Sequence, residues 1–253
     1  MLQTERHEII MEKILKEQSI RTIDLCDLLN VSRQTIRNDL EYLDSIGKLK
    51  KVHGGAILEK KSIEPSFETR SNNNLIEKKA IAEKAVQMIE DGDTIYLDIG
   101  TTVGEMIPHL NNFYNLTVIT NSINFAYQLS QYENIRVICS GGEMRNSEKS
   151  LSGHIARKIL ENYYVDKSFI GIGGISEKAG YTDYYIDEAE IRKLMINHSN
   201  TSYALLDYSK VGVIAIAKYA DLSDIGTVIT DCKTSKNIID SLQSHGVDVI
   251  TVE

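Results

Sequence analysis

Small, hydroxyl-bearing residues follow a short β-rich segment at positions 94–97 of this 253-residue chain. The segment leads into Asp98-Ile99-Gly100-Thr101-Thr102, and a helix is expected directly afterwards. Gly100 permits close approach of the backbone, while Thr101 and Thr102 offer hydroxyl and backbone N–H donors at a helix N-terminus, where anions bind. This pattern predicts an anion site, most simply for a phosphate. The plainer interpretation is a tight turn with a helix cap.

Other β-rich segments end in side chains that suit a sugar. Asn121, Ser122 and Glu143 can pair with hydroxyl groups, and adjacent glycines let the backbone come close to a ligand. Lys210 ends a further segment with one ammonium group, although a lone lysine is more often a surface residue. The predicted ligand-binding residues are Asp98, Gly100, Thr101, Thr102, Thr120, Asn121, Ser122, Gly141, Gly142, Glu143, Arg145 and Lys210.

A second group of residues, near the N-terminus, has the chemistry of DNA recognition. Arginine can reach O6 and N7 of guanine, glutamine and asparagine can read adenine, and Ser32 or Thr35 at a helix N-terminus can hold a phosphate. Lysines in a following hairpin would lie along the sugar-phosphate backbone. The predicted DNA-binding residues are Ser32, Arg33, Gln34, Thr35, Arg37, Asn38, Lys50, Lys51 and His53.

These DNA-binding residues require a helix-turn-helix followed by a hairpin. Apolar residues at helical spacing predict a helix over 5–17, a second over 22–30 and a third, capped by Ser32, that ends at Gly47. Alternating apolar residues around a glycine pair predict a small hairpin, or wing, at 48–58. The alternative is a generic helical subdomain with a solvated charged face. The order of cap, turn, polar helix and basic hairpin favours the winged helix-turn-helix.

The ligand-binding residues require a different architecture. Beyond Gly92, seven β-rich runs alternate with helical stretches, and most of the runs lack polar alternation. Strands buried on both faces and separated by helices imply a mostly parallel sheet in an α/β layer fold, where ligands bind beyond the carboxyl ends of the strands. The runs are 94–97, 116–120, 136–139, 168–172, 203–206, 227–229 and 247–252.

A polar stretch separates the two parts. Residues 59–74 have little apolar content, one of the two prolines and a run of asparagines, so they are predicted to connect two domains. The DNA-binding domain is then expected over 1–58 and the α/β domain over 75–253, beginning with a helix at about 75–90.

The charge of the chain is unevenly distributed between these parts. The net charge is −8, but residues 1–61 carry +1 and the remainder carries −9. A near-neutral domain with a local basic face can still bind phosphates, so the acidity of the whole chain does not exclude DNA binding.

Other sequence features exclude several classes of site. Three widely spaced cysteines argue for reduced thiols, and the spacing of cysteine and histidine fits no zinc motif, so we expect no bound metal. A Walker A pattern and a dinucleotide fingerprint are both missing, so we expect no cofactor. Apolar runs of about 18 residues and a secretory signal are also missing, which predicts a soluble, cytoplasmic protein.

Both parts of the sequence resemble the DeoR family of bacterial transcriptional regulators. In the N-terminal part the resemblance rests on Val31-Ser32, Thr35-Ile36-Arg37, Asp39-Leu40 and His53-Gly54-Gly55-Ala56. In the C-terminal part it rests on Lys79-Ala80-Ile81-Ala82, Asp98-Ile99-Gly100-Thr101-Thr102, Thr120-Asn121-Ser122, Gly141-Gly142-Glu143, Leu151-Ser152-Gly153 and Asp207-Tyr208-Ser209-Lys210. Three residues depart from the family pattern. Asn38 replaces a second arginine, Cys26 an alanine, and Ile99 a serine or alanine.

The resemblance implies a sensor domain similar in fold to ribose-5-phosphate isomerase that binds phosphorylated sugars or polyols. We therefore expect a repressor of a carbohydrate-utilisation operon, and not an enzyme. Such an effector would release the repressor from double-stranded operator DNA. Pairing of recognition helices predicts a homodimer or homotetramer, with no membrane partner. One alternative is a sugar-phosphate isomerase with an accessory DNA-binding domain, using Glu143 and Lys210 as acid-base groups. Another is a repressor whose effector is an unphosphorylated polyol or a different anion.

Overall fold

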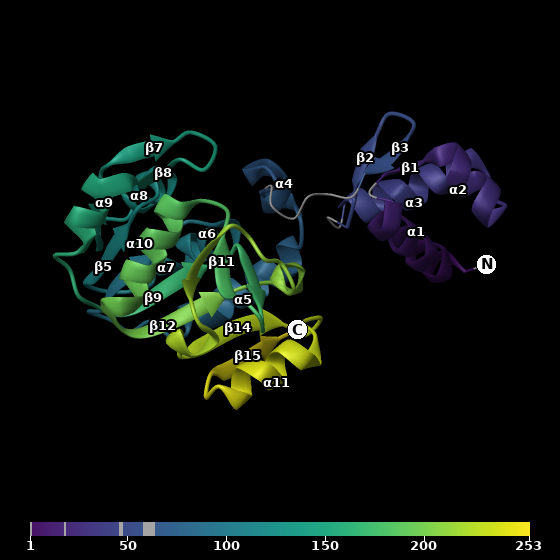
Figure 1. The fold of residues 1–253 in the computed structure, drawn as a ribbon. Coiled ribbons are helices and arrows are strands. Elements are labelled where there is room, and N and C mark those ends of the chain that lie inside the picture. The colour runs from purple at the N-terminus through teal and green to yellow at the C-terminus, as the bar shows by residue number, and fades with distance from the viewer. Residues whose placement is uncertain (1, 18, 46–47, 58–63) are drawn as a thin grey trace. The chain divides into compact units, whose positions relative to one another are not determined.

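The structure, a computed structural model, describes residues 2–17, 19–45, 48–57 and 64–253. The chain forms two compact units, Met1–Ile63 and Glu64–Glu253 (Figure 1). The apolar side chains of the first unit form one buried cluster, and those of the second form two. Each unit therefore folds around a hydrophobic core of its own.

Within its described residues, the first unit combines three helices with a three-stranded antiparallel sheet of order β1-β3-β2. Ile10, Leu25, Ile36 and Leu40 are buried in its core, so each helix turns its apolar face inward. The elements are α1 (Gln3–Glu17), β1 (Ser19–Arg21), α2 (Thr22–Leu29), α3 (Arg33–Ser45), β2 (Lys50–Val52) and β3 (Gly55–Ile57).

The turn between α2 and α3 is capped on both sides. Asn30 follows α2 in the left-handed conformation, with φ of 51° and ψ of 48°. The backbone N–H of Thr35 donates to Oγ of Ser32 over 3.1 Å, which caps α3. The predicted helix-turn-helix is therefore confirmed. The predicted end of the third helix, at Gly47, lies outside the described residues.

The wing hairpin is also confirmed, as β2 paired with β3. The sequence did not predict the third strand, β1, which pairs with the other side of β3. A Cβ on Gly55 would lie 2.1 Å from the carbonyl oxygen of Ile20, so only glycine allows β1 and β3 to approach this closely. The wing is thereby attached to the chain that leads into α2.

The centre of the second unit is a seven-stranded parallel sheet of order β15-β14-β12-β9-β4-β5-β6. Each strand coincides with one of the seven predicted runs to within a few residues at its ends, so the predicted sheet is confirmed. The strands are β4 (Thr94–Leu97), β5 (Leu116–Thr120), β6 (Ile135–Cys139), β9 (Val165–Gly171), β12 (Ser199–Leu205), β14 (Thr227–Asp231) and β15 (Asp248–Val252).

Helices cover both faces of this sheet. One face packs against α9 (Gly153–Leu160), α10 (Ile186–Asn197) and α11 (Lys236–Ser244), and the other against α5 (Leu75–Val86), α6 (Thr101–Gly104), α7 (Ile107–Leu110) and α8 (Ile123–Leu129). On β4, Tyr96 joins the first apolar cluster while Ile95 and Leu97 join the second. Burial on both sides explains why the strands lack polar alternation.

Smaller elements surround the sheet. They are α4 (Phe67–Asn72), the hairpin β7 (Glu143–Arg145) with β8 (Ser150–Ser152), the sheet of β10 (Gly174–Ser176), β11 (Gly180–Asp183) and β13 (Ala217–Ala220), and the 3₁₀ turns η1 (Tyr208–Lys210) and η2 (Leu222–Asp224). Helix α4 lies within the stretch that the sequence assigned to the connection. It packs against α6, and residues 64–74 belong to the second unit.

The strand order places a topological switch point at β4 and β9. From β4 the chain moves through β5 to β6 on one side, and then crosses to β9 on the other side of β4. Connections that leave in opposite directions open a crevice beyond the carboxyl ends of these two strands, where ligands bind in such folds.

Candidate functional site

The loops after β4 and β9 meet at the switch point. The backbone N–H of Gly171 donates to Oδ2 of Asp98 over 3.0 Å. A Cβ on Gly171 would lie 2.5 Å from the carbonyl oxygen of Ile99, so the contact between the loops requires glycine. Gly100 has a φ of 133°, which other residues rarely adopt. The first N–H groups of α6, from Thr101 onward, have no partner within the helix, so this loop can present donors to an anion.

Asp98 is held by an arginine that the sequence did not single out. Asp98 is 1% exposed and Arg192 is 4% exposed, and the Arg192 Nε donates to Asp98 Oδ2 over 2.7 Å. A second ion pair joins Arg192 to Asp183. Burial raises the pKa of Asp98, whereas the charge of Arg192 and its hydrogen bond act to lower it. Asp98 therefore positions the loop, and its carboxylate is occupied by protein groups.

The loop after β5 presents the predicted Thr120, Asn121 and Ser122, all buried. The Thr120 Oγ1 accepts from the backbone N–H of Ser122, and the Ser122 Oγ caps α8. The Asn121 Nδ2 donates to the carbonyl oxygen of Leu151 over 3.4 Å, while its Oδ1 has no hydrogen-bond partner among the described residues. A buried acceptor without a partner is costly, so Asn121 Oδ1 can accept a hydrogen bond from a hydroxyl group of a ligand.

Lys210 and Lys78 lie within electrostatic reach of each other, and Lys78 belongs to α5, which packs against α6. Lys210 ends η1 and is half-buried; burial lowers its pKa, and the carboxylate of Asp207 opposes that change. Lys78, on α5, is 3% exposed and donates to the carbonyl oxygens of Arg70 and Asn73 at the C-terminal end of α4. Burial lowers the pKa of Lys78 to about 8. The sequence missed Lys78 and Arg70, because nothing in their local pattern marks Lys78 as buried or Arg70 as partly buried.

The remaining predicted residues lie around β6 and its hairpin. A Cβ on Gly142 would lie 2.5 Å from the carbonyl oxygen of Ser152, so packing of the turn already explains this glycine. Gly141 has a φ of 66°, and the side chain of Glu143 is exposed. The two terminal nitrogens of the Arg145 guanidinium group are occupied by carboxylates.

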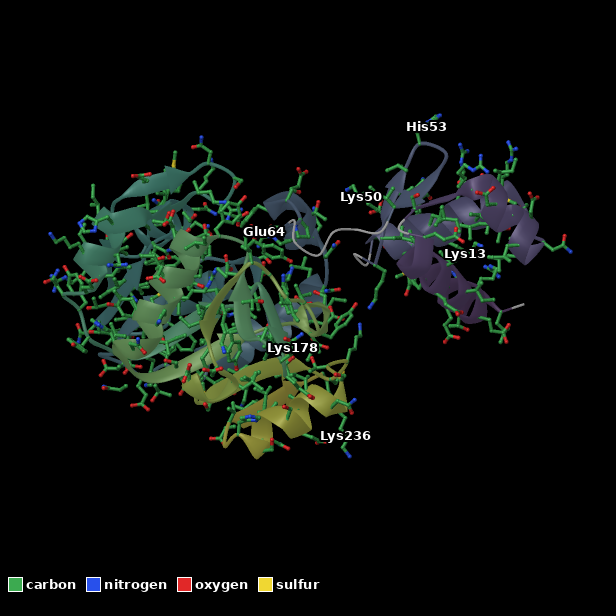
Figure 2. The ribbon with its side chains drawn as sticks, in the orientation of Figure 1. Lys13, Lys50, His53, Glu64, Lys178 and Lys236 are labelled. Atoms are coloured by element: carbon green, nitrogen blue, oxygen red, sulfur yellow. The ribbon has the colours of Figure 1, made fainter. Side chains whose placement is uncertain are left out.

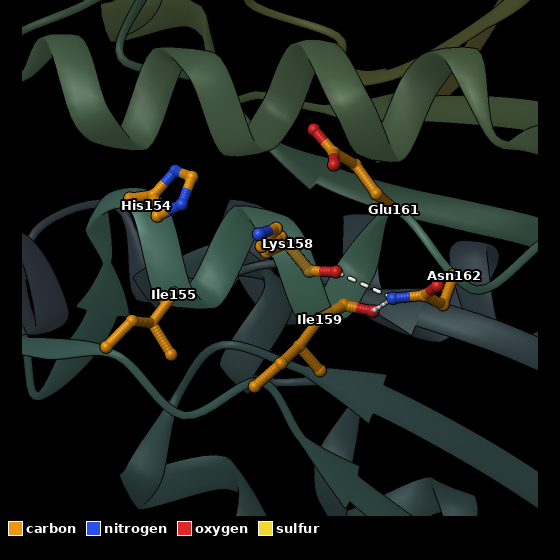
Figure 3. A pocket seen from close by; sticks show the side chains of 6 residues that line it. All are labelled: His154, Ile155, Lys158, Ile159, Glu161 and Asn162. Carbon is orange, nitrogen blue, oxygen red and sulfur yellow. Dashed lines mark hydrogen bonds between the residues drawn. The ribbon is translucent and has the colours of Figure 1, made fainter.

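Open hollows occur on the surface of α9. One, of about 440 Å³, is lined by His154, Ile155, Lys158, Ile159, Glu161 and Asn162 (Figure 3). The Asn162 Nδ2 donates to the carbonyl oxygen of Lys158 there over 2.7 Å. A second hollow, of about 220 Å³, also lies beside α9. None of the predicted ligand-binding residues lines either hollow.

In the first unit, α3 exposes the predicted DNA-reading residues. Arg33, Gln34, Arg37 and Asn38 are exposed, and the Gln34 Nε2 donates to Asn38 Oδ1 over 2.9 Å. Within the described part of the chain, neither arginine forms an ion pair, so both guanidinium groups are available to bases or phosphates.

The wing contributes further cations. Figure 2 shows His53 at the tip of the hairpin and Lys50 nearer its base. Both are exposed, whereas Lys51 forms an ion pair with Glu41 on α3. Lys50 and His53 can therefore reach a DNA backbone more readily than Lys51.

On the opposite face of α3, the charged residue Asp39 is buried and forms ion pairs with α1, which the sequence did not indicate. Asp39 is 1% exposed, and it accepts from Arg6 Nε over 2.8 Å and from Arg6 Nη2 over 3.0 Å. The His7 Nε2 lies 3.0 Å from Asp39 Oδ1. Burial acts to raise the pKa of Asp39, but the hydrogen bonds of Arg6 and His7 outweigh it and hold the pKa below its usual range. The ion pair sets the orientation of α3 against α1.

None of the helices in the described ranges is long and apolar enough to cross a membrane. In the same ranges, no group of three or more His, Cys, Asp or Glu side chains is arranged to hold a metal ion.

Two family models match the chain. The DeoR-like helix-turn-helix domain matches residues 6–62, and the DeoR C terminal sensor domain matches residues 73–232. Together they include both groups of predicted site residues.

Curated relatives match over nearly the whole chain. The uncharacterized HTH-type transcriptional regulator YulB of Bacillus subtilis is 38% identical, over 100% of this chain and 98% of its own length. The HTH-type transcriptional regulator GolR of Listeria innocua is 35% identical over 100% of both chains. The glycerol-3-phosphate regulon repressor of Escherichia coli is 30% identical over 98% of this chain and 99% of its own.

Among solved structures, ribose 5-phosphate isomerase A from Methanocaldococcus jannaschii aligns with a TM-score of 0.41 and 22% identity over 55% of each chain. The family models and the full-length relatives agree with both units of the fold. This chain belongs to the DeoR family of transcriptional regulators.

Proposed function

We propose that the protein represses a carbohydrate-utilisation operon and is released from operator DNA by a phosphorylated sugar or polyol. The observation that carries the proposal is the exposed face of α3, capped by Ser32, on which Arg33 and Arg37 have no ion pair within the described residues. Such a face suits the major groove. The relatives include the repressor of a glycerol-3-phosphate regulon, which supports a sugar-related operon.

On the DNA side, the predicted set from Ser32 to Asn38 reads bases and phosphates, and Lys50, Lys51 and His53 follow the backbone. Two copies of the chain bind operator half-sites about 34 to 36 Å apart, as a homodimer or within a homotetramer. The protein acts in the cytoplasm and has no enzymatic role.

On the effector side, the phosphate binds the N–H groups of the loop from Gly100 to Thr102, and Lys210 supplies positive charge. Asn121 accepts a hydrogen bond from a hydroxyl group of the sugar through its Oδ1, which has no partner among the described residues. The remaining residues of the predicted set shape the crevice around these contacts. Because the proposed donors are backbone groups and a lysine, we expect recognition of the phosphate to be stronger than recognition of the sugar.

Release follows from linkage between the two sites. The effector lowers operator affinity only if it binds the DNA-incompetent arrangement more tightly than the DNA-bound one. Operator DNA must then lower the affinity of the protein for the effector by the same factor.

A thermal-shift screen of the full-length protein tests the effector site. The panel contains ribose 5-phosphate, glucose 6-phosphate, fructose 1-phosphate and glycerol 3-phosphate, each compared with its unphosphorylated counterpart. A ligand that binds only the folded protein raises the melting temperature. We expect at least one phosphate to do so, and Thr101→Ala and Lys210→Ala to reduce its effect. The exposed Lys236→Ala serves as control.

Three results of this screen and one further assay count against the proposal. Equal shifts with a sugar and its phosphate would favour the unphosphorylated effector. Equal shifts in Lys210→Ala and Lys236→Ala would remove Lys210 from the site. Protein that responds to none of the compounds would leave the proposed effector class without support. Turnover of ribose 5-phosphate by the purified protein would favour the isomerase alternative.

A further inference from the structure

Glu64, the first residue of the second unit, is bound by two arginines from different elements. Its Oε2 lies 2.5 Å from Arg145 Nη2 on β7, and its Oε1 lies 3.1 Å from Arg70 Nη2 on α4. The Glu64 side chain is 13% exposed, and those of Arg70 and Arg145 are 11% and 16% exposed. These ion pairs therefore lie in a setting that solvent screens only weakly.

Two more carboxylates complete this group. Glu148 forms an ion pair with Arg70, and the Arg145 Nη1 lies 2.9 Å from Oε2 of the buried Glu188. Three carboxylates thus surround two guanidinium groups. We call Glu64, Arg70, Arg145, Glu148 and Glu188 the Glu64 network.

The hydrogen bonds of the Glu64 network are incomplete. Arg145 Nε is buried and has no hydrogen-bond partner among the described residues, and Arg70 Nη2 contacts Glu64 and Glu148 without forming an aligned hydrogen bond to either. The carboxylates therefore balance the charge of the arginines without satisfying the direction of every N–H group. Such donors are open to another acceptor.

The Glu64 network lies within electrostatic reach of the proposed phosphate site. Helix α4 packs against α6, whose first turn forms part of that site. Beyond the dominant effect of burial, Arg70 lowers the pKa of Lys210 and Glu64 raises it. A phosphate beside Lys210 would add negative charge where carboxylates already outnumber the arginines. Repulsion and competition for Arg70 would then fall on the nearest carboxylates.

We propose that Glu64 is an internal competitor of the effector phosphate, and that the phosphate displaces it from Arg70 and Arg145. This proposal rests on the proposed function. Glu64 directly follows the chain that joins the second unit to the first, so its release removes the ion pairs that hold the first residue of the second unit to α4 and β7. The binding of an anion is thereby converted into a change at the end of the sensor that continues into the DNA-binding unit.

The test compares Glu64→Gln with Glu68→Gln in the full-length protein. Glu68 is exposed on α4, four residues along the chain from Glu64, so its substitution removes the same charge close by without removing a member of the Glu64 network. Binding of glucose 6-phosphate, fructose 1-phosphate and glycerol 3-phosphate is measured by isothermal titration calorimetry, with inorganic phosphate as the smallest probe. Melting temperatures establish that both variants are folded.

Removal of the competitor should tighten binding of the phosphate about fivefold or more in Glu64→Gln, and by less than twofold in Glu68→Gln. Hydrogen exchange gives an independent measurement. The N–H groups of Arg70 and Asn73, which bond to Ser66 and Thr69 within α4, should exchange faster when the phosphate is added to the wild type. In Glu64→Gln they should already exchange fast without ligand.

The outcomes distinguish this proposal from the one on which it rests. If the wild type binds a sugar phosphate but Glu64→Gln binds it no more tightly, the competitor role is wrong while the effector site stands. An equal gain in both variants would assign the effect to general charge and would also overturn the role of Glu64. If neither the wild type nor Glu64→Gln binds any of the phosphates, both proposals fail.

Discussion

Replacement of Arg192 by methionine removes a cation that contacts both Asp98 and Asp183. Arg192 is 4% exposed, Asp98 1% and Asp183 3%, so no solvent is available to replace the lost charge. Methionine fills much of the same volume and leaves the apolar contacts in place. The variant therefore isolates the cost of two buried carboxylates that have lost their partner.

The magnitude follows from the burial of the pair. Removal of one partner of a buried ion pair costs about 3 to 5 kcal/mol. For a unit of this size, each 1 kcal/mol lowers the melting temperature by about 2 to 4 °C. We therefore expect Arg192→Met to lower the melting temperature of the second unit by roughly 6 to 20 °C at pH 7.

The pH dependence gives a second signature. Burial already raises the pKa of Asp98 in the wild type, and loss of Arg192 raises it further. A raised carboxyl pKa contributes stability that is fully present below the unfolded value of about 3.9 and is lost as the pH rises through the folded pKa. The deficit of the variant should accordingly be smaller at pH 5 than at pH 7.

Thermal unfolding followed by circular dichroism measures both effects, since the chain has no tryptophan. Lys193→Met is the matched control, because Lys193 is the exposed neighbour on the same helix. Equal melting temperatures for the two variants at pH 7 would refute the reasoning. A deficit that grows on acidification would contradict the assignment to buried carboxylates.

Three further predictions concern other parts of the molecule. Arg37→Ala should weaken operator binding by about 1 to 3 kcal/mol and relax base preference at one position, as measured by fluorescence anisotropy. Gly171→Ala should destabilise the second unit by about 1 to 3 kcal/mol in urea unfolding, since its Cβ would lie 2.5 Å from the Ile99 carbonyl oxygen, whereas Gly226→Ala meets nothing within 4 Å. Asp39→Asn should lower the melting temperature of the first unit. Arg6 and His7 lower the pKa of Asp39, so the wild type should lose this stabilisation only below about pH 4, as the pH falls through the folded pKa. The melting temperature of Asp39→Asn should show no such loss, because the variant has no carboxylate to protonate.

The sequence predicted the seven parallel strands and the helix-turn-helix because each is marked by residues that are close together in the chain. The five inner strands of the parallel sheet are largely buried, and the edge strands β6 and β15 are partly buried, so all seven appear as short apolar runs. The helix-turn-helix is marked by Asn30 and Ser32, whose capping roles depend on neighbours in the chain.

The residues that the sequence missed depend on distant partners. Arg192 meets Asp98 across 94 positions, and on α10 it looks like any other charged helical residue. Helix α4 buries none of its residues, so its polar composition resembled a connection. Strand β1 has three residues, too few for a pattern to emerge, and it depends on the missing side chain of Gly55.

The separate hydrophobic cores of the two units have a consequence for recombination. Among the described residues, the apolar cluster of the first unit shares no member with the two clusters of the second. A gene fusion at the connection therefore divides none of these three clusters. Exchange of the first unit between relatives can redirect the same sensor to a new promoter, which makes the connection a natural crossover point for evolution and for engineered biosensors.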